Sequence, residues 1–206
     1  MVRRVVALPA LALALAGCMT TASNTLPQDR VASFRVTAVN VGFSRDARIV
    51  WGDGERAYAA TKGLPAHQSD TVANTPEAQS YMRNVIGSKM KAAMGRRLSE
   101  RLKGSNPVRV DVTISELSLS SAVQRILVGG HHTLTADVSL VDAKTGAVLI
   151  EYPAQKSTSM AGQGIGGALL DQALLAEPLD RVADGYASEY AYWLMPDDKT
   201  RQTGGM

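Results

Sequence analysis

Cysteine is almost absent from this chain: Cys18 is the only one among 206 residues. A lone cysteine cannot form a disulfide within the chain, so packing and hydrogen bonds must hold the fold. Thiolate metal sites and cysteine-based catalysis in the body of the protein are excluded as well. Cys18 therefore needs an explanation of its own.

The chain also lacks a long hydrophobic run, and its net charge is small. The longest apolar run, Val5–Ala16, has twelve residues, whereas a membrane-spanning helix needs about 20. The formal net charge of +3 includes Arg3 and Arg4, so removing the segment before Cys18 leaves +1. Such a charge does not support a nucleic-acid partner. Apolar residues still make up 45% of the chain, which is typical of a globular protein.

The first eighteen residues combine charge, hydrophobicity and small side chains in the order of an export signal. Two arginines precede the apolar run, and small residues come directly before the cysteine. Leu15-Ala16-Gly17-Cys18 resembles the lipobox, the cleavage and lipidation signal of exported bacterial lipoproteins. The resemblance implies cleavage before Cys18, diacylation of its thiol and acylation of its new amino group. An ordinary cleaved signal and an N-terminal membrane helix are the alternatives.

Lipidation would decide where the protein resides. Two or three acyl chains hold a protein firmly, because each buried CH₂ contributes about 0.8 kcal/mol. Met19 follows the cysteine, whereas an aspartate there is associated with retention in the inner membrane of well-studied bacteria. We therefore expect an outer-membrane anchor with the domain facing the periplasm, and inner-membrane anchoring stays open.

The chain divides into four parts. We expect a signal peptide at 1–17, the lipidated cysteine and a flexible polar tether at 18–30, one domain at 31–195 and a disordered tail at 196–206. A domain of that length can bury a core of its own.

Hydrophobic alternation predicts four strands, at 31–43, 107–119, 131–141 and 147–157. The alternation changes phase near Ala38 and near Ser115-Glu116, which predicts a β-bulge at each place. Asp142–Gly146 predicts a turn with Gly146 at positive φ, so that the last two strands form an antiparallel hairpin. Residues 44–74 are expected to form a long irregular loop, whose Trp51 either packs on the core or serves function.

Two long amphipathic helices are expected. Thr75-Pro76-Glu77 supplies an N-cap, a proline at the first helical position and an acid in the first turn. An apolar row follows at every fourth residue, with Gly104 as the C-cap: Met82, Ile86, Met90, Met94, Leu98 and Leu102. The second helix is expected between Pro178 and Pro196. Together these elements predict an α+β fold, a curved and mainly antiparallel sheet of about four strands with two long helices packed on one face.

The first helix also carries many cations: Arg83, Lys89, Lys91, Arg96, Arg97, Arg101 and Lys103. Because they are spread around the helix, we favour a solvated outer face. The alternative is a basic face that rests on anionic headgroups or lipopolysaccharide.

The sequence contains no convincing catalytic, cofactor or metal site. Gly162–Gly167 has the spacing G-x-G-x-x-G, but no strand with a terminal acid follows, so we interpret it as a hinge or a close-packing loop. His131 and His132 are neighbours on a strand and face opposite sides, so they cannot chelate one ion; His132 is expected to point into the core. No G-x-S-x-G motif is present. We therefore assign one functional residue, Cys18, as the site of lipid attachment.

The stretch from Val108 to Leu149 carries a resemblance to known families. A strand, the segment Arg125–Gly130, a second strand and the hairpin Val141–Leu149 resemble several small, uncharacterised lipoprotein families of proteobacteria, and distantly the auxiliary lipoproteins of envelope transport systems. The resemblance implies a periplasmic domain that acts through protein or lipid contacts. We thus expect a non-enzymatic accessory protein whose envelope partner contacts the sheet edge, the 44–74 loop or the 120–130 connection. A periplasmic hydrolase or small-ligand-binding enzyme, and a structural lipoprotein that contacts lipopolysaccharide or cell wall, are the alternatives.

Overall fold

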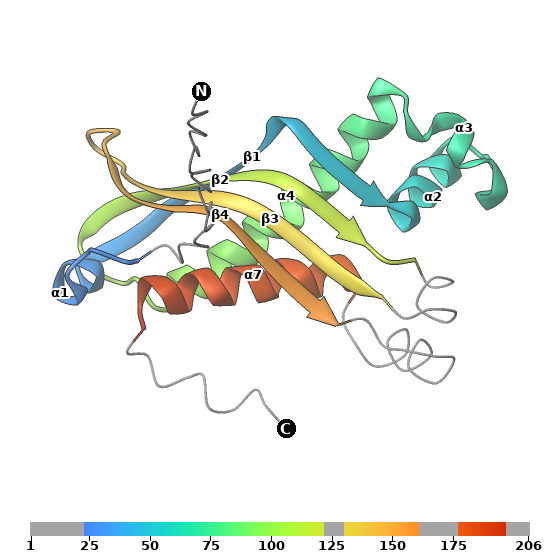
Figure 1. Cartoon of the computed structure of the whole chain (residues 1–206). Coiled ribbons are helices and arrows are strands. Elements are labelled where there is room, and N and C mark those ends of the chain that lie inside the picture. Colours follow the sequence, from blue (N-terminus) through green and yellow to red (C-terminus); the bar gives the residue numbers. More distant parts are fainter. Residues whose placement is uncertain (1–22, 122–129, 161–176, 197–206) are drawn as a thin grey trace, which may run out of the picture.

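The computed structural model describes residues 23–121, 130–160 and 177–196. In chain order the elements are α1 (Gln28–Ala32), β1 (Phe34–Trp51), α2 (Gly52–Thr61), η1 (Ala66–Gln68), α3 (Asp70–Ala73), α4 (Pro76–Ser99), β2 (Asn106–Leu119), β3 (His131–Asp142), β4 (Val148–Met160) and α7 (Pro178–Leu194) (Figure 1). Among the described residues, no helix is both long and apolar enough to cross a membrane.

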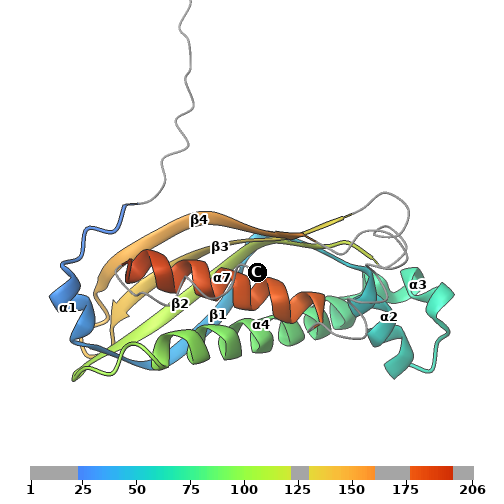
Figure 2. The same cartoon turned by 90° about the horizontal axis from the view of Figure 1, so that it is seen from below.

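One four-stranded sheet forms the body, in the order β1-β2-β3-β4. The β2–β3 and β3–β4 pairs are antiparallel, whereas β1 and β2 are parallel because α4 returns the chain to the starting end between them. Helices α4 and α7 lie side by side on one face of the curved sheet (Figure 2). The expected α+β fold is therefore confirmed.

The β-bulges and the hairpin turn lie where the sequence predicts them. The β1–β2 register shifts between Val36 and Ala38, and the β2–β3 register shifts between Ile114 and Glu116. Gly146 has φ of +76°, and its N–H donates to the carbonyl oxygen of Asp142 at 2.9 Å. Local side-chain patterns thus fixed these features.

The prediction of a long irregular loop at 44–74 is wrong. β1 continues to Trp51, and α2, η1 and α3 follow. A second register shift between Phe43 and Arg48 interrupts the alternation of apolar and polar residues. A period-two pattern therefore does not identify the part of the strand after Phe43. The three helices are too short, at 3 to 10 residues, to show a clear helical period. Trp51 is partly buried and packs against the core.

Helix α4 begins as predicted and ends earlier. The Thr75 hydroxyl oxygen accepts a hydrogen bond from the Ala78 N–H at 3.2 Å, and the apolar row of every fourth residue is at most 1% exposed. The helix ends at Ser99, so Gly104 is not its C-cap. Gly104 instead donates its N–H to the Phe34 carbonyl oxygen at 2.8 Å, and a Cβ atom there would overlap the carbonyl group of Ser33. Close backbone approach, not helix capping, requires this glycine.

The domain begins before residue 31, and the expected tether at 18–30 is therefore too long. α1 occupies Gln28–Ala32, with Val31 fully buried, so that the first strand starts at Phe34. Leu26 packs against the core as well. Four segments named above lie outside the described residues: Cys18, residues 122–129 of the 120–130 connection, the glycine-rich link Gly162–Gly167, and residues 197–206.

Candidate functional site

β1 forms one of the two edges of the described sheet. Among the described strands, β1 pairs only with β2. The segment before β2 covers the start of its other side, through the Arg35–Lys103 bridge and the Gly104 N–H, and the edge is open beyond that point. The strand is 18 residues long and contains no proline. A row of unpaired backbone groups of this kind is a template for another strand.

The opposite edge, β4, is less suited to pairing. It carries Pro153, which lacks an N–H, and Ala154, whose φ is +39°. The β3–β4 register shifts at the same place, and the Ala154 N–H donates to an Oδ atom of Asp137 at 2.6 Å. Proline, an irregular backbone and exposed charge such as Lys156 are common devices against edge pairing. β1 also has exposed charges and two register shifts, so the difference between the two edges is that β1 contains no proline.

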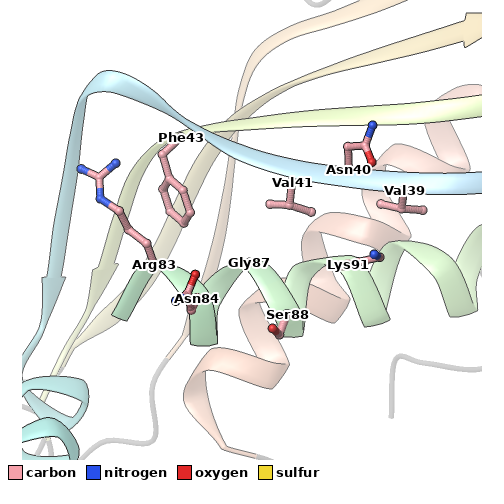
Figure 3. Close-up of a pocket in the computed structure, with 9 residues that line it drawn as sticks. All are labelled: Val39, Asn40, Val41, Phe43, Arg83, Asn84, Gly87, Ser88 and Lys91. Carbon is pink, nitrogen blue, oxygen red and sulfur yellow. The ribbon is translucent and has the colours of Figure 1, made fainter. Parts of the chain in front are cut away.

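A groove lies between this edge and helix α4 (Figure 3). It consists of two adjoining hollows with volumes of about 430 and about 410 Å³, which share Val39, Asn40 and Lys91. We call it the β1–α4 groove. Its lining comes from residues 36–43 of β1 and from the following residues of α4: Arg83, Asn84, Gly87, Ser88, Lys91, Gly95 and Ser99.

Small side chains on α4 create the groove. Gly87, Gly95 and Ser99 recur at helical spacing on the face that turns toward the edge strand. A Cβ atom at Gly95 would meet no other atom within 4 Å, and one at Gly87 would reach only the Phe43 ring, at 4.0 Å. Glycine is unfavourable within helices by up to about 1 kcal/mol relative to alanine, so this row costs the helix stability. The open space it leaves is the groove.

Apolar side chains of β1 form the opposite wall. Val39, Val41 and Phe43 point toward α4, whereas Asn40 points away (Figure 3). The bulge at Val36–Ala38 sets this phase, because it moves the inward position from even to odd residue numbers. The wall therefore depends on an irregularity that the sequence already predicts.

The groove carries positive charge without a matching anion. The Arg83 guanidinium lies 5.1 Å from the centre of the Phe43 ring, and neither Arg83 nor Lys91 forms an ion pair with a described residue. Two solvent-facing cations next to an apolar wall fit a partner with both acidic and apolar side chains.

Other cations of α4 serve the contact with α7. Lys89 Nζ lies 2.9 Å from a carboxylate oxygen of Asp180, and Arg96 lies 2.7 Å from Asp184. The hydrogen bond to Asp180 is the main reason that the pKa of Lys89 is raised, although burial opposes it. The cations thus divide between two faces of the helix and do not form one basic stripe.

Asp111, which lies opposite Asn40 on the neighbouring strand, already has hydrogen-bond partners. Asp111 accepts hydrogen bonds from Arg109 at 2.8 Å and from the Asn40 amide at 2.9 Å. These bonds, chiefly the one from Arg109, lower the pKa of the Asp111 carboxyl although burial opposes them. Asp111 therefore stays ionised and paired at neutral pH, which does not suit it to proton transfer.

The three histidines of the enzyme alternative do not converge in the described part of the chain, and the serine opposite His132 in the β3–β4 pair is Ser159. His131 is exposed and His132 is fully buried, as expected from strand alternation, while His67 is exposed on η1. The buried Ser157 donates its hydroxyl to Glu189 at 3.0 Å. No group of three or more metal-ligating side chains occurs among the described residues.

The sequence patterns did not predict the groove. They predicted the apolar row of α4, but not the neighbouring row, one residue further along the chain, in which Gly87, Gly95 and Ser99 lie. The sequence did contain a signal for the groove, namely the recurring glycines in a helix that is otherwise well capped. Each glycine lowers the stability of the helix, so its presence suggests that open space is needed at that position.

Comparisons with known proteins show similarity in fold only. No family model matches the chain, and no curated protein is similar to it. Among solved structures, protein XCC0632 from Xanthomonas campestris, of the family model DUF330, is 9% identical over 78% of this chain and 83% of that chain, with a TM-score of 0.41. The PelC dodecamer from Paraburkholderia phytofirmans is 11% identical over 80% and 94%, with a TM-score of 0.36. Lipoprotein GNA1162 from Neisseria meningitidis is 16% identical over 66% and 94%, with a TM-score of 0.24. At these identities and scores, the similarities carry no argument about what the groove binds.

Proposed function

We propose that this protein is a lipid-anchored, non-enzymatic accessory protein of the bacterial outer membrane, which holds an extended segment of an envelope partner in the β1–α4 groove. The observation that supports it is the groove beside an open, proline-free edge strand. The anchor is Cys18, supported by the lipobox-like sequence before it.

Strand addition explains how such a site would bind. An incoming strand gains main-chain hydrogen bonds along the edge, and alternate side chains enter the adjoining hollows. Residues 36–43 of β1 form the lining, and eight extended residues span about 26 Å. Two hollows along that length fit two or three alternating side chains of the partner strand. Acidic side chains among them would lie near Arg83 and Lys91.

Photo-crosslinking tests the groove directly. A benzoyl-phenylalanine placed at Asn84, which is exposed and lines the groove, should capture one defined partner in intact cells. The same group at Arg97, exposed on α4 but outside the lining, is the matched position and should not capture it.

Filling the groove should abolish the capture. Gly95→Leu adds a large side chain where the backbone leaves open space, so the helix folds and the hollow closes. Gly95→Ala gains the same helix propensity, up to about 1 kcal/mol, without filling the hollow, and should keep the crosslink. Equal crosslinking from both photo-reactive positions, or an unchanged product in Gly95→Leu, would contradict binding in the groove.

A further inference from the structure

The chain that leads to Cys18 leaves the body at one defined place, the C-terminal end of α7. The Asn24 side-chain amide donates to the carbonyl oxygens of Trp193, at 3.2 Å, and Leu194, at 2.9 Å. The Gln28 amide reaches the Leu194 carbonyl as well, at 3.4 Å. These bonds satisfy carbonyl groups at the end of a helix, which have no partner within it.

Several other segments gather at this end. The Asn106 N–H donates to the Ser33 carbonyl oxygen at 2.9 Å, and the Ala143 N–H donates to the Pro107 carbonyl oxygen at 3.1 Å. The start of β2 therefore lies beside the end of α1, and the turn between β3 and β4 lies against the start of β2, at the same end of the sheet as α1 (Figure 1). We call residues 24–35, 102–107, 142–148 and 193–195 the tether end.

The opposite end consists of α2, η1 and α3, at 52–73 (Figures 1 and 2). Helix α4 connects the two ends, starting beside α2 and ending near the tether end. Its 24 residues correspond to about 36 Å along the axis. The two ends are thus separated by most of the length of the molecule.

The reach of the tether is shorter than this separation. Asn24 is six residues beyond Cys18, and a fully extended chain advances at most about 3.6 Å per residue, or roughly 22 Å in all. If acyl chains on Cys18 enter the bilayer, as the proposed function requires, the tether end must stay close to the headgroups. The α2–α3 end has no such restraint.

Charge favours the same orientation. The segments 24–35 and 102–107 each have a net charge of +1, and 142–148 is neutral. The segment 52–73 has a net charge of −1. Anionic headgroups attract the first group and repel the second.

We propose that the tether end faces the lipid surface and that the α2–α3 end points away from it, so that the β1–α4 groove runs lengthwise away from the membrane. Within the groove, Ser99 and Val36 lie nearest the bilayer, and Arg83 and Phe43 lie farther out. A partner strand bound there extends from the membrane into the periplasm. This inference rests on the proposed anchor but not on the identity of the partner.

Energy transfer to labelled lipids tests the orientation. Once Cys18 is acylated, an introduced cysteine is the only free thiol, because the chain has no other. Lys144→Cys, in the tether end, and Lys62→Cys, just after α2, each replace an exposed lysine and carry the same net charge. Each mature lipoprotein is labelled with a donor dye and reconstituted in phosphatidylethanolamine and phosphatidylglycerol vesicles that contain acceptor-labelled headgroups.

We expect strong energy transfer to the headgroups from a dye at position 144, and much weaker energy transfer from a dye at position 62. Equal transfer from both positions, or stronger transfer from 62, would show that the body lies flat or inverted and would overturn the orientation. Flotation of the vesicles separates this failure from failure of the anchor. If the lipoprotein does not float with the vesicles, or a Cys18→Ser protein floats equally well, lipid anchoring at Cys18 is wrong and the orientation falls with it.

Discussion

Gly104 lies where the chain passes from α4 to β2, with its backbone against that of Ser33. A side chain there would overlap the Ser33 carbonyl group, so only glycine fits without a shift of one segment. The sequence could assign this glycine to a helix end, because a Gly after an amphipathic run is the common C-cap signal. It could not show that a segment seventy residues earlier passes so close.

Gly104→Ala should therefore destabilise the protein by about 1–3 kcal/mol, the usual cost of overpacking. Denaturant unfolding of the purified domain measures it. Gly95→Ala is the internal control, because that position is open and the substitution should stabilise by up to about 1 kcal/mol. If both variants shift stability in the same direction, the close approach at Gly104 is not the cause.

Asp142 closes the turn between β3 and β4. Its carboxylate accepts the backbone N–H groups of Lys144, at 2.8 Å, and Thr145, at 2.9 Å. These bonds, first that from Thr145, lower the pKa of the Asp142 carboxyl below its ordinary value. A carboxyl whose pKa is lower in the folded than in the unfolded protein stabilises the fold above its ordinary pKa. That contribution disappears as the pH falls through the lowered value.

Asp142→Ala should consequently lower the Tm at pH 7, and the difference from the unmodified protein should shrink below about pH 4. Thermal unfolding across pH 2.5–8, followed by circular dichroism, measures the two curves. A Tm difference that stays constant over this range would mean that the charge of Asp142 has no part in the turn.

At the scale of elements, α4 serves two contacts with different residues. Its apolar row is buried against the sheet, and Lys89 and Arg96 pair with acids of α7. The row of small residues faces the edge strand and leaves the groove. The sequence indicated a cation-rich helix but not this division, because ion pairs across helices depend on where α7 packs.

The Lys89–Asp180 pair should contribute modestly to this packing. Its side chains are 38% and 29% exposed, and pairs of this kind are worth about 0.2–1 kcal/mol. A double-mutant cycle of Lys89→Ala and Asp180→Ala should give a coupling energy in that range at low salt, smaller at 0.5 M salt. A coupling of zero at low salt would mean that the Lys89–Asp180 pair does not contribute to the packing of the two helices.

At the scale of the molecule, the described sheet is open and its two edges differ. Pro153 and the irregular backbone after it interrupt β4, whereas β1 contains no proline and lies beside a groove whose cations, Arg83 and Lys91, form no ion pair with a described residue. The proposed strand addition uses this proline-free edge. The proposed orientation would place that edge upright on the membrane, within reach of partners that extend into the periplasm.

Much of this architecture followed from local sequence patterns. The bulges near Ala38 and Ser115-Glu116, the turn at Asp142–Gly146 and the start of α4 at Thr75 depend on neighbouring side chains, which a single sequence contains. The loop expected at 44–74 failed because a second shift in β1 and three short helices leave no sustained period.

The sequence by itself determined the alternating strands, the two amphipathic helices and the lipobox-like signal that predicts an anchor at Cys18. Only the tertiary structure decided that β1 pairs in parallel, that small residues of α4 face its free edge, and that Asn24 docks on Leu194. The reason is separation along the chain. Each of these features joins segments about 50 to 170 residues apart, and local patterns do not say which distant surfaces meet.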